Sequence, residues 1–250
     1  MTERTKLHYQ LIAAWCGIAF TVGFFVGWYG IGHFYSPATA TLSPEELANY
    51  FAVNRQRIVI GCALCCIAAA LHVPWTAQLG LVMARIEGSM PVLAISQIVG
   101  GALTILVFSF PPTVWVAAGY RSQVDPNLLR AMNDIAWMGF DLTWALTSVQ
   151  MTAAALVGLA DKSPSPLFPR WLCYEGLAGA VAFASLTGVA FFKSGPFAWD
   201  GILAFWVPYN MWVLWFVGFS VCMIIDIRRK LRAMDFVPAQ GLAHGIATQP

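Results

Sequence analysis

The chain has 250 residues, of which 59% are hydrophobic and 10% are charged, and its mean hydropathy is +0.67. Soluble globular domains carry about 25% charged residues, so this composition excludes an ordinary soluble protein and predicts an integral membrane protein. The formal net charge is only +2 and the basic residues lie mostly in short loops and at the chain ends, which gives no sign of a nucleic-acid partner.

We predict an all-α fold: a polytopic transmembrane helical bundle of six spans, forming one domain over residues 1–232. About 20 apolar residues are needed per crossing, and the length of the chain leaves no room for a separate soluble domain. Residues 233–250 are expected to form a mobile cytoplasmic tail. The expected spans are about 11–32, 57–83, 91–110, 130–160, 171–192 and 202–225.

The first span and the loop after it carry two local signals. Gly23 and Gly27 form a Gly-x-x-x-Gly pattern, which lets a neighbouring helix approach closely. In the loop, Ser43, Pro44 and Glu46 have the spacing of a capping box with proline at the first helical position. We therefore expect a short amphipathic helix on the membrane surface between the first two spans.

Small and polar residues form one stripe along the second span, and prolines punctuate the second and third spans. Pro74 is expected to kink the second span and to free backbone carbonyls near His72. Pro111 and Pro112 are expected to break the third span, which is tolerated at membrane depth only inside protein or beside a water-filled cavity. The stripe on the second span consists of Gly61, Cys65, Ala68, His72 and Thr76.

The fourth span contains two carboxylates, and a charged residue at bilayer depth is a candidate functional residue. Asp141 lies about 16 Å along the helix from Arg130 at 1.5 Å per residue, too deep for a short side chain to reach the surface. It must be protonated, paired or hydrated, and His72 is the expected partner by depth alone. On a continuous helix, one face would carry Asp134, Asp141, Ala145, Ser148 and Thr152.

These considerations predict a ligand-binding or proton-handling site whose candidate residues are Asp141, His72, Trp137, Trp144, Asn210 and Ser148. Asp134 and Glu175 are secondary candidates, since Asp134 is expected to pair with Arg130 and Glu175 with Arg170 near the cytoplasmic surface. Alternatively, Asp141 forms a purely structural hydrogen bond between helices. Trp137 and Trp144 either wall a cavity for an organic or cationic ligand or fill space between helices.

No cofactor and no metal are expected. A membrane b-type haem needs paired axial histidines, and only His72 lies at depth. The Glu-x-x-His pairs of a di-iron bundle are missing from the sequence. The six cysteines lie in apolar runs, where cysteine behaves as a small hydrophobic residue.

Lys and Arg are distributed unequally between the loops on the two sides of the expected bundle. Five lie on the side opposite the N-terminus, and the positive-inside rule therefore predicts that both termini are cytoplasmic. The nine on the N-terminal side are Arg4, Lys6, Arg85, Lys162, Arg170, Arg228, Arg229, Lys230 and Arg232.

Three segments in the last third of the chain, SPLFPRWLCYEG, FFKSGPFAWDG and FWVPYNMW, resemble recurring features of a family of small bacterial multi-pass membrane proteins with no assigned activity. This resemblance implies a location in the bacterial inner membrane and a six-helix bundle. It implies no reaction or substrate.

The favoured function is the binding or transport of a small organic or lipophilic molecule in a cavity between spans two, three, four and six. Membrane lipids are expected partners. The sequence leaves open whether the chain forms a homo-oligomer or binds another membrane protein. One alternative is a non-catalytic accessory or structural subunit of a larger membrane complex, with the small-residue stripes of spans one and two facing another protein. A second is an intramembrane acid–base enzyme acting on a lipid or terpenoid through Asp141, His72 and Glu175, although Glu175 is expected far from Asp141.

Overall fold

The structure is a computed structural model that describes residues 1–35, 37–121 and 124–245, with side chains described up to Asp235. These residues form helices and no strand, which confirms the predicted all-α class. The elements are α1 (Glu3–Phe25), the π-helix η1 (Val26–Ile31), α2 (Pro44–Ala69), α3 (His72–Glu87), α4 (Val92–Tyr120), α5 (Pro126–Asp141), α6 (Trp144–Ala160), α7 (Arg170–Ala182), the 3-10 helix η2 (Phe183–Ala190), the π-helix η3 (Ile202–Trp206) and α8 (Val207–Gly245).

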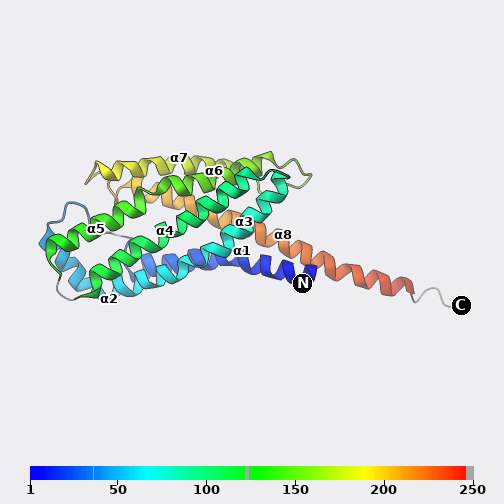
Figure 1. The fold of residues 1–250 in the computed structure, drawn as a ribbon, viewed down its shortest axis with the longest axis horizontal. Coiled ribbons are helices and arrows are strands. Elements are labelled where there is room, and N and C mark those ends of the chain that lie inside the picture. Colours follow the sequence, from blue (N-terminus) through cyan, green and yellow to red (C-terminus); the bar gives the residue numbers. More distant parts are fainter. Residues whose placement is uncertain (36, 122–123, 246–250) are drawn as a thin grey trace.

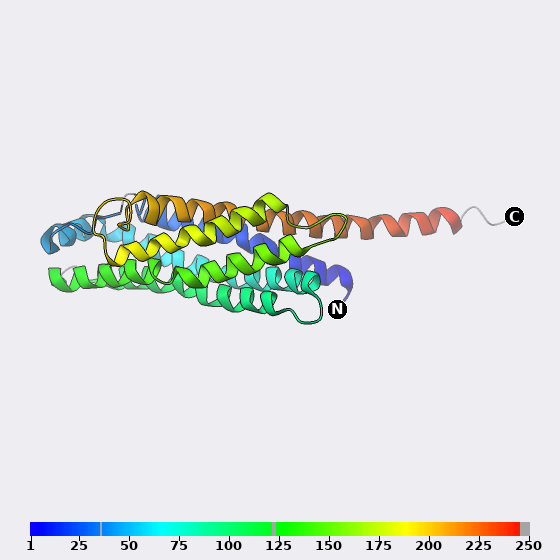
Figure 2. The same ribbon diagram turned by 90° about the horizontal axis from the view of Figure 1, so that it is seen from above.

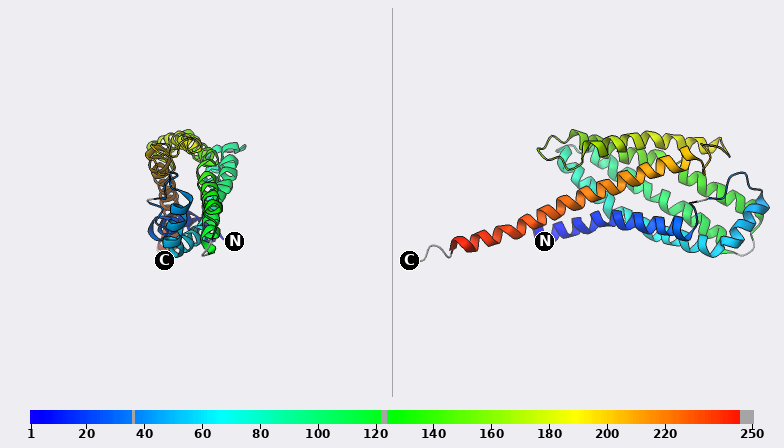
Figure 3. Two further views of the ribbon diagram at one scale, coloured as in Figure 1. Left: turned by 90° about the vertical axis from the view of Figure 1, so that its left-hand side faces the viewer. Right: turned by 180° about the vertical axis from the view of Figure 1, so that it is seen from behind.

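These elements combine into six helical segments that are long and apolar enough to cross a membrane, as the sequence predicts. They lie along one long axis, and both termini are at the same end of the bundle (Figure 1). Seen from above and from behind, α8 crosses beside α1 and continues past the end of the bundle (Figures 2 and 3). The segments are Glu3–Ile31, Pro44–Glu87, Val92–Tyr120, Pro126–Ala160, Arg170–Ala190 and Ile202–Asp235.

The outer surface of the bundle is far more apolar than that of a soluble protein. Large aliphatic side chains point outward, for example Ile67 at 71% and Val181 at 75% exposure. A surface of this kind is stable in contact with lipid, where polar side chains have to face the interior. The buried polar side chains are Thr21, His72, Thr76, Gln78, Gln97, Thr104, Asn133, Asp141, Thr147, Gln150 and Ser220.

Glycines bring the first and second spans into backbone contact, whereas the sequence predicts close approach by a neighbouring helix without identifying that helix. A Cβ atom on Gly27 would lie 2.7 Å from the carbonyl oxygen of Gly61, and one on Gly23 would lie 3.3 Å from the Cβ of Ala68. The small-residue stripes of these two spans therefore face each other within one chain. The accessory-subunit alternative expected the same stripes to face another protein, so this contact does not favour it.

The capping box at the start of α2 is present, but the separate amphipathic helix expected there is not. The Ser43 hydroxyl accepts the Glu46 N–H at 3.2 Å, and the Glu46 carboxylate accepts the Ser43 N–H at 2.8 Å. The helix then continues through Ala69, because no proline follows Pro44 until Pro74. The expected surface helix is thus the beginning of the second span.

The predicted break at Pro111 and Pro112 is wrong, since α4 is one helix from Val92 to Tyr120. Side-chain donors bond to carbonyls around the two prolines: the Thr113 hydroxyl to Ser109 O at 2.8 Å and the Ser109 hydroxyl to Ile105 O at 2.9 Å. The helix also packs against α2, α3, α5 and α6. These contacts hold the proline-containing segment in helical geometry.

Two other spans are interrupted, and each interruption lies next to a predicted site residue. The second span turns at Ala70 and Leu71, directly before His72, because Pro74 has no N–H to donate to the Ala70 carbonyl. That carbonyl accepts from the Val73 N–H instead, at 3.3 Å. The predicted kink at Pro74 is therefore confirmed.

The fourth span is not the continuous helix that we expected over residues 130–160. It turns at Leu142 and Thr143, directly after Asp141. The backbone tightens after this turn, because the Leu146 N–H bonds to the Thr143 carbonyl three residues earlier, at 3.2 Å, in place of a carbonyl four residues earlier. Asp141 therefore lies at the junction of two helices.

The expected tail begins inside α8, which continues as a helix to Gly245. Residues 233–245 of that tail are thus helical in the structure. Residues 246–250 lie outside the described residues. The mobility predicted for 233–250 stays a prediction.

Candidate functional site

Asp141 is 1% exposed and lies at the turn between α5 and α6. The hydroxyl of Tyr209 on α8 donates to its Oδ1 atom at 2.5 Å. Its Oδ2 atom is buried and has no hydrogen-bond partner among the described residues. The prediction that His72 is the partner of Asp141 is therefore wrong, because Tyr209 makes this hydrogen bond.

The position of Tyr209 follows from the irregular start of the last span. The π-helix η3 leads into α8, whose second residue, Pro208, has no N–H and frees a carbonyl in the preceding turn. The Tyr209 ring then packs edge-on against Phe183, Phe205 and Trp28, with centroids 6.0, 5.6 and 6.0 Å away. This aromatic packing directs the hydroxyl toward Asp141.

A small cavity lies beside this pair, with a volume of about 10 Å³. A cavity of this size has room for about one water molecule, so in this conformation it admits no organic ligand. Trp144 contributes to its wall, as expected of a cavity-lining tryptophan. Its lining residues are Val107, Phe108, Phe140, Trp144, Thr147, Phe183, Tyr209 and Trp212.

Trp137 does not line this cavity. Its ring stacks on Trp199 at 5.7 Å with an interplanar angle of 11°, and it packs edge-on against Trp115 at 5.1 Å. Trp137 is 1% exposed and lies in a continuous group of aromatic rings. Of the two roles weighed for this residue, its surroundings match the filling of space between helices.

His72 is fully buried among aromatic rings. It stacks on Phe216 at 5.3 Å, and its Nδ1 atom lies 3.0 Å from the Thr76 hydroxyl. Its Nε2 atom has no hydrogen-bond partner among the described residues. Phe108 packs against His72 at 5.9 Å and also against Phe140 at 6.3 Å, the residue before Asp141. The imidazole thus meets aromatic rings rather than the carboxylate.

Amide and hydroxyl groups from α3, α4 and α6 form a buried polar row that the sequence analysis missed. The Thr104 and Thr147 hydroxyls are 3.3 Å apart, and the Gln150 amide donates to the Thr76 hydroxyl at 3.4 Å. Thr147 also lines the cavity beside Tyr209, and Thr76 lies 3.0 Å from Nδ1 of His72. A sequence signal existed: Thr147 and Gln150 are three residues apart, and Gln97 and Thr104 seven, which places each pair on one helix face.

Several atoms of this polar row lack partners. Oε1 of Gln150 and both side-chain polar atoms of Gln97 are buried without a hydrogen-bond partner among the described residues. Buried polar groups are ordinarily hydrogen-bonded to protein or to ordered water. The row therefore has free hydrogen-bonding capacity inside the membrane-spanning part of the bundle.

Two other predicted residues lie away from the cavity. Asn210 is exposed on the outside of α8 and donates to the Trp206 carbonyl at 2.6 Å. Ser148 donates to the Ala180 carbonyl at 3.0 Å and so joins α6 to α7. Ala145, which was expected on the same inward face as Asp141, is exposed. The turn after Asp141 interrupts the continuous helix that this expectation assumed.

The expected ion pairs of the secondary candidates do not form. Among the described residues, ion pairs join Arg4 to Asp235, Lys6 to Glu3 and Lys230 to Asp226, and neither Asp134 nor Glu175 takes part in one. Asp134 is partly buried. Both carboxylate oxygens of Glu175 are buried without a hydrogen-bond partner in the described part of the chain. Among the described residues, no hydrogen bond or ion pair therefore joins Asp141, His72 and Glu175, the three residues of the enzyme alternative.

Metal-ligating side chains do not gather anywhere in the residues that the structure describes. Cys62 and Cys65 have Cys-x-x-Cys spacing, and the expectation that the chain has no such pair is wrong. Both thiols are free and buried in α2.

Compared with protein-family models, with curated proteins and with solved structures, the chain matches none of them. The family resemblance of its last third stays a prediction. A functional assignment therefore rests on the geometry around Asp141.

Proposed function

We propose that this protein binds or transports a small organic molecule across the bacterial inner membrane, and that Asp141 takes up and releases a proton in the process. One observation carries the proposal: Asp141 is buried at a helix interruption, with Oδ1 bonded to Tyr209 and Oδ2 unpartnered. Carboxylates inside membrane spans commonly mark proton relays and solute pathways. A merely structural hydrogen bond would not require the free oxygen.

The interruption itself supports this role. In many transporters, substrates and coupling ions bind where membrane helices are discontinuous, because the two half-helix ends offer free carbonyl and N–H groups. Here α5 ends at Asp141 and α6 begins at Trp144. The polar row through Thr147, Thr104 and Gln150 supplies further groups through which a proton or a water molecule can pass.

The proton-handling part of the proposal fits the described conformation better than the organic ligand does. The cavity of about 10 Å³ beside Tyr209 accommodates about one water molecule. Entry of an organic molecule would require the turn at 142–143 or the rings of Trp144 and Trp212 to move. The binding step is thus expected in a second, more open conformation.

The charge distribution supports a location with both termini in the cytoplasm. Nine of the 14 Lys and Arg residues belong to the loops and ends on the side of the N-terminus. Both termini lie at the same end of the bundle, as six crossings require (Figure 1). The positive-inside rule then assigns that end to the cytoplasm.

The proposal is tested with purified protein in liposomes that contain a pH-sensitive dye. A potassium diffusion potential drives protons, and the initial rate of internal acidification is measured. We expect the wild-type rate to exceed that of protein-free liposomes, and Asp141→Asn to reduce the protein-dependent rate at least about tenfold, as loss of a relay group removes the route.

Asp134→Asn is the matched control, because it removes a second carboxylate from the same span without touching the Tyr209 pair. Size-exclusion elution and the amount of inserted protein show that each variant is folded. An Asp141→Asn variant with the wild-type rate, or a wild-type rate equal to that of empty liposomes, would overturn the proton-handling role. Native mass spectrometry of the same preparations reports any retained organic ligand.

A further inference from the structure

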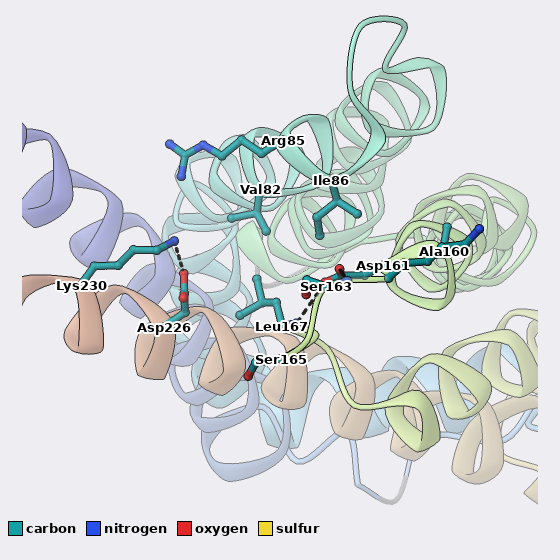
Figure 4. Close-up of a pocket in the computed structure, with 11 residues that line it drawn as sticks. Val82, Arg85, Ile86, Ala160, Asp161, Ser163, Ser165, Leu167, Asp226 and Lys230 are labelled. Carbon is teal, nitrogen blue, oxygen red and sulfur yellow. Dashed lines mark hydrogen bonds and ion pairs between the residues drawn. The ribbon is translucent and has the colours of Figure 1, made fainter. Parts of the chain in front are cut away.

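A pocket of about 500 Å³ opens at the end of the bundle that carries the N-terminus, between α3, α8 and the loop after α6. Figure 4 shows Arg85 and Lys230 reaching from α3 and α8 toward the same side of this pocket. Ser163 and Ser165 contribute hydroxyls from the loop. We propose that this pocket binds the phosphate group of an anionic phospholipid.

The acidic side chains of the pocket are engaged within the protein. Asp226 pairs with Lys230 at 2.6 Å, and Asp161 accepts the backbone N–H groups of Ser163 at 2.9 Å and Leu167 at 3.2 Å. Arg85 and Lys162, which also line the pocket, make no ion pair or side-chain hydrogen bond with described residues. The three cations of the lining exceed its two carboxylates by one, and the unpaired Arg85 can bind phosphate oxygens through two parallel hydrogen bonds.

The whole end of the bundle favours an anionic ligand. Its nine Lys and Arg residues are accompanied by six acidic residues, which leaves an excess of three positive charges; the six are Glu3, Glu87, Asp161, Glu175, Asp226 and Asp235. At the opposite end, five basic residues face five acidic ones, namely Glu45, Glu46, Asp125, Asp134 and Asp200. Lys and Arg residues near the membrane surface attract an anionic leaflet.

One wall of the pocket is apolar, which favours a lipid over a free phosphate ion as the ligand. Val82, Ile86 and Leu167 line the same pocket as the cations (Figure 4). Next to Val82 in the sequence, Leu81 is 53% exposed on the outer surface of α3. Acyl chains can thus lie along α3 while the headgroup phosphate occupies the pocket. This inference does not depend on the role proposed for Asp141.

The test is native mass spectrometry of the full-length protein exchanged into detergent with equal amounts of phosphatidylglycerol and phosphatidylcholine of the same acyl chains. We expect wild-type protein to retain phosphatidylglycerol preferentially. The double variant Arg85→Gln, Lys162→Gln should lower the retained fraction roughly tenfold to thirtyfold, the effect of two lost cations. The double variant Arg170→Gln, Arg232→Gln removes the same charge at the same end outside the pocket and should retain the lipid.

Equal losses in the two double variants would overturn the site, because net charge alone would then explain retention. Equal retention of both lipids by the wild type would do the same. In a separate experiment, glycerol 3-phosphate or inorganic phosphate is added to the lipid-bound protein at about 10 mM, roughly a thousandfold excess over protein. We expect the lipid to stay bound, and complete displacement would show that the pocket takes a free phosphate and not a lipid. Elution volume and thermal midpoint verify that the exposed substitutions leave the fold intact.

Discussion

The hydroxyl of Tyr209 lies 2.5 Å from Oδ1 of Asp141, although the two residues are 68 positions apart. This bond ties the start of α8 to the turn between α5 and α6. Both side chains are buried, at 7% and 1% exposure, so neither group can exchange its partner for bulk water. The pair therefore couples the last span to the interruption in the fourth.

Removing the Tyr209 hydroxyl should destabilise the protein. In Tyr209→Phe, both carboxylate oxygens of Asp141 become unpartnered, and an unsatisfied buried polar group costs about 1–3 kcal/mol. We expect a lower thermal midpoint in detergent and an altered rate in the liposome proton assay. Tyr174→Phe is the control, since Tyr174 is 57% exposed. Equal midpoints for the two variants would show that the Tyr209 bond contributes nothing.

A methyl group at the crossing of the first two spans should separate them. The Cβ of Gly27→Ala would lie 2.7 Å from the backbone oxygen of Gly61, which has no side-chain freedom with which to move away. Overpacking of this kind costs about 1–3 kcal/mol. Gly30→Ala is the control on the same π-helix, because nothing lies within 4 Å of a Cβ there. Thermal unfolding should show a loss for Gly27→Ala alone, and a loss of similar size for Gly30→Ala would contradict the steric explanation.

The loop after α6 should loosen in acid. Burial alone would raise the pKa of Asp161, but hydrogen bonds from Ser163 and from the Leu167 N–H outweigh it and hold the pKa below its usual value. A carboxylate with a depressed folded-state pKa stabilises the fold above its unfolded-state pKa of about 4. That contribution is lost as the pH falls through the lower folded-state value.

Hydrogen exchange of residues 161–167 measures this effect. We expect protection of the Ser163 and Leu167 amides to fall as the pH is lowered below about 4, after correction for the intrinsic rate. In Asp161→Asn the ionisable acceptor is gone, so the pH dependence should vanish. Retention of a wild-type pH profile in that variant would assign the transition to another group.

Much of the fold could be predicted from local properties of the sequence. A helix-length segment of high hydropathy is a candidate membrane span. The six candidate spans can therefore be read from the hydropathy of successive segments of the sequence. The capping box at Ser43 and the kink at Pro74 depend on neighbours within four residues. The close approach of a neighbouring helix at Gly27 could also be foreseen, because small residues permit close approach wherever two helices meet.

The partner of Asp141 could not be found in this way. Depth alone pointed to His72, but which side chains meet is decided by the rotation of each helix about its axis, and α8 presents Tyr209. A turn after Asp141 also displaced the residues of α6 from the face calculated for a continuous helix. No proline lies at that turn, so nothing in the local sequence indicated it.

The sequence by itself thus determined the all-helical class, the six segments long and apolar enough to cross a membrane, and the place of Asp141 near the middle of the fourth segment. Those properties depend on hydrophobicity and short-range backbone chemistry. Only the tertiary structure decided that Asp141 meets Tyr209 and that Thr104, Thr147 and Gln150 form a polar row beside them. Such contacts depend on how separate helices pack side by side, and packing is a property of the whole bundle.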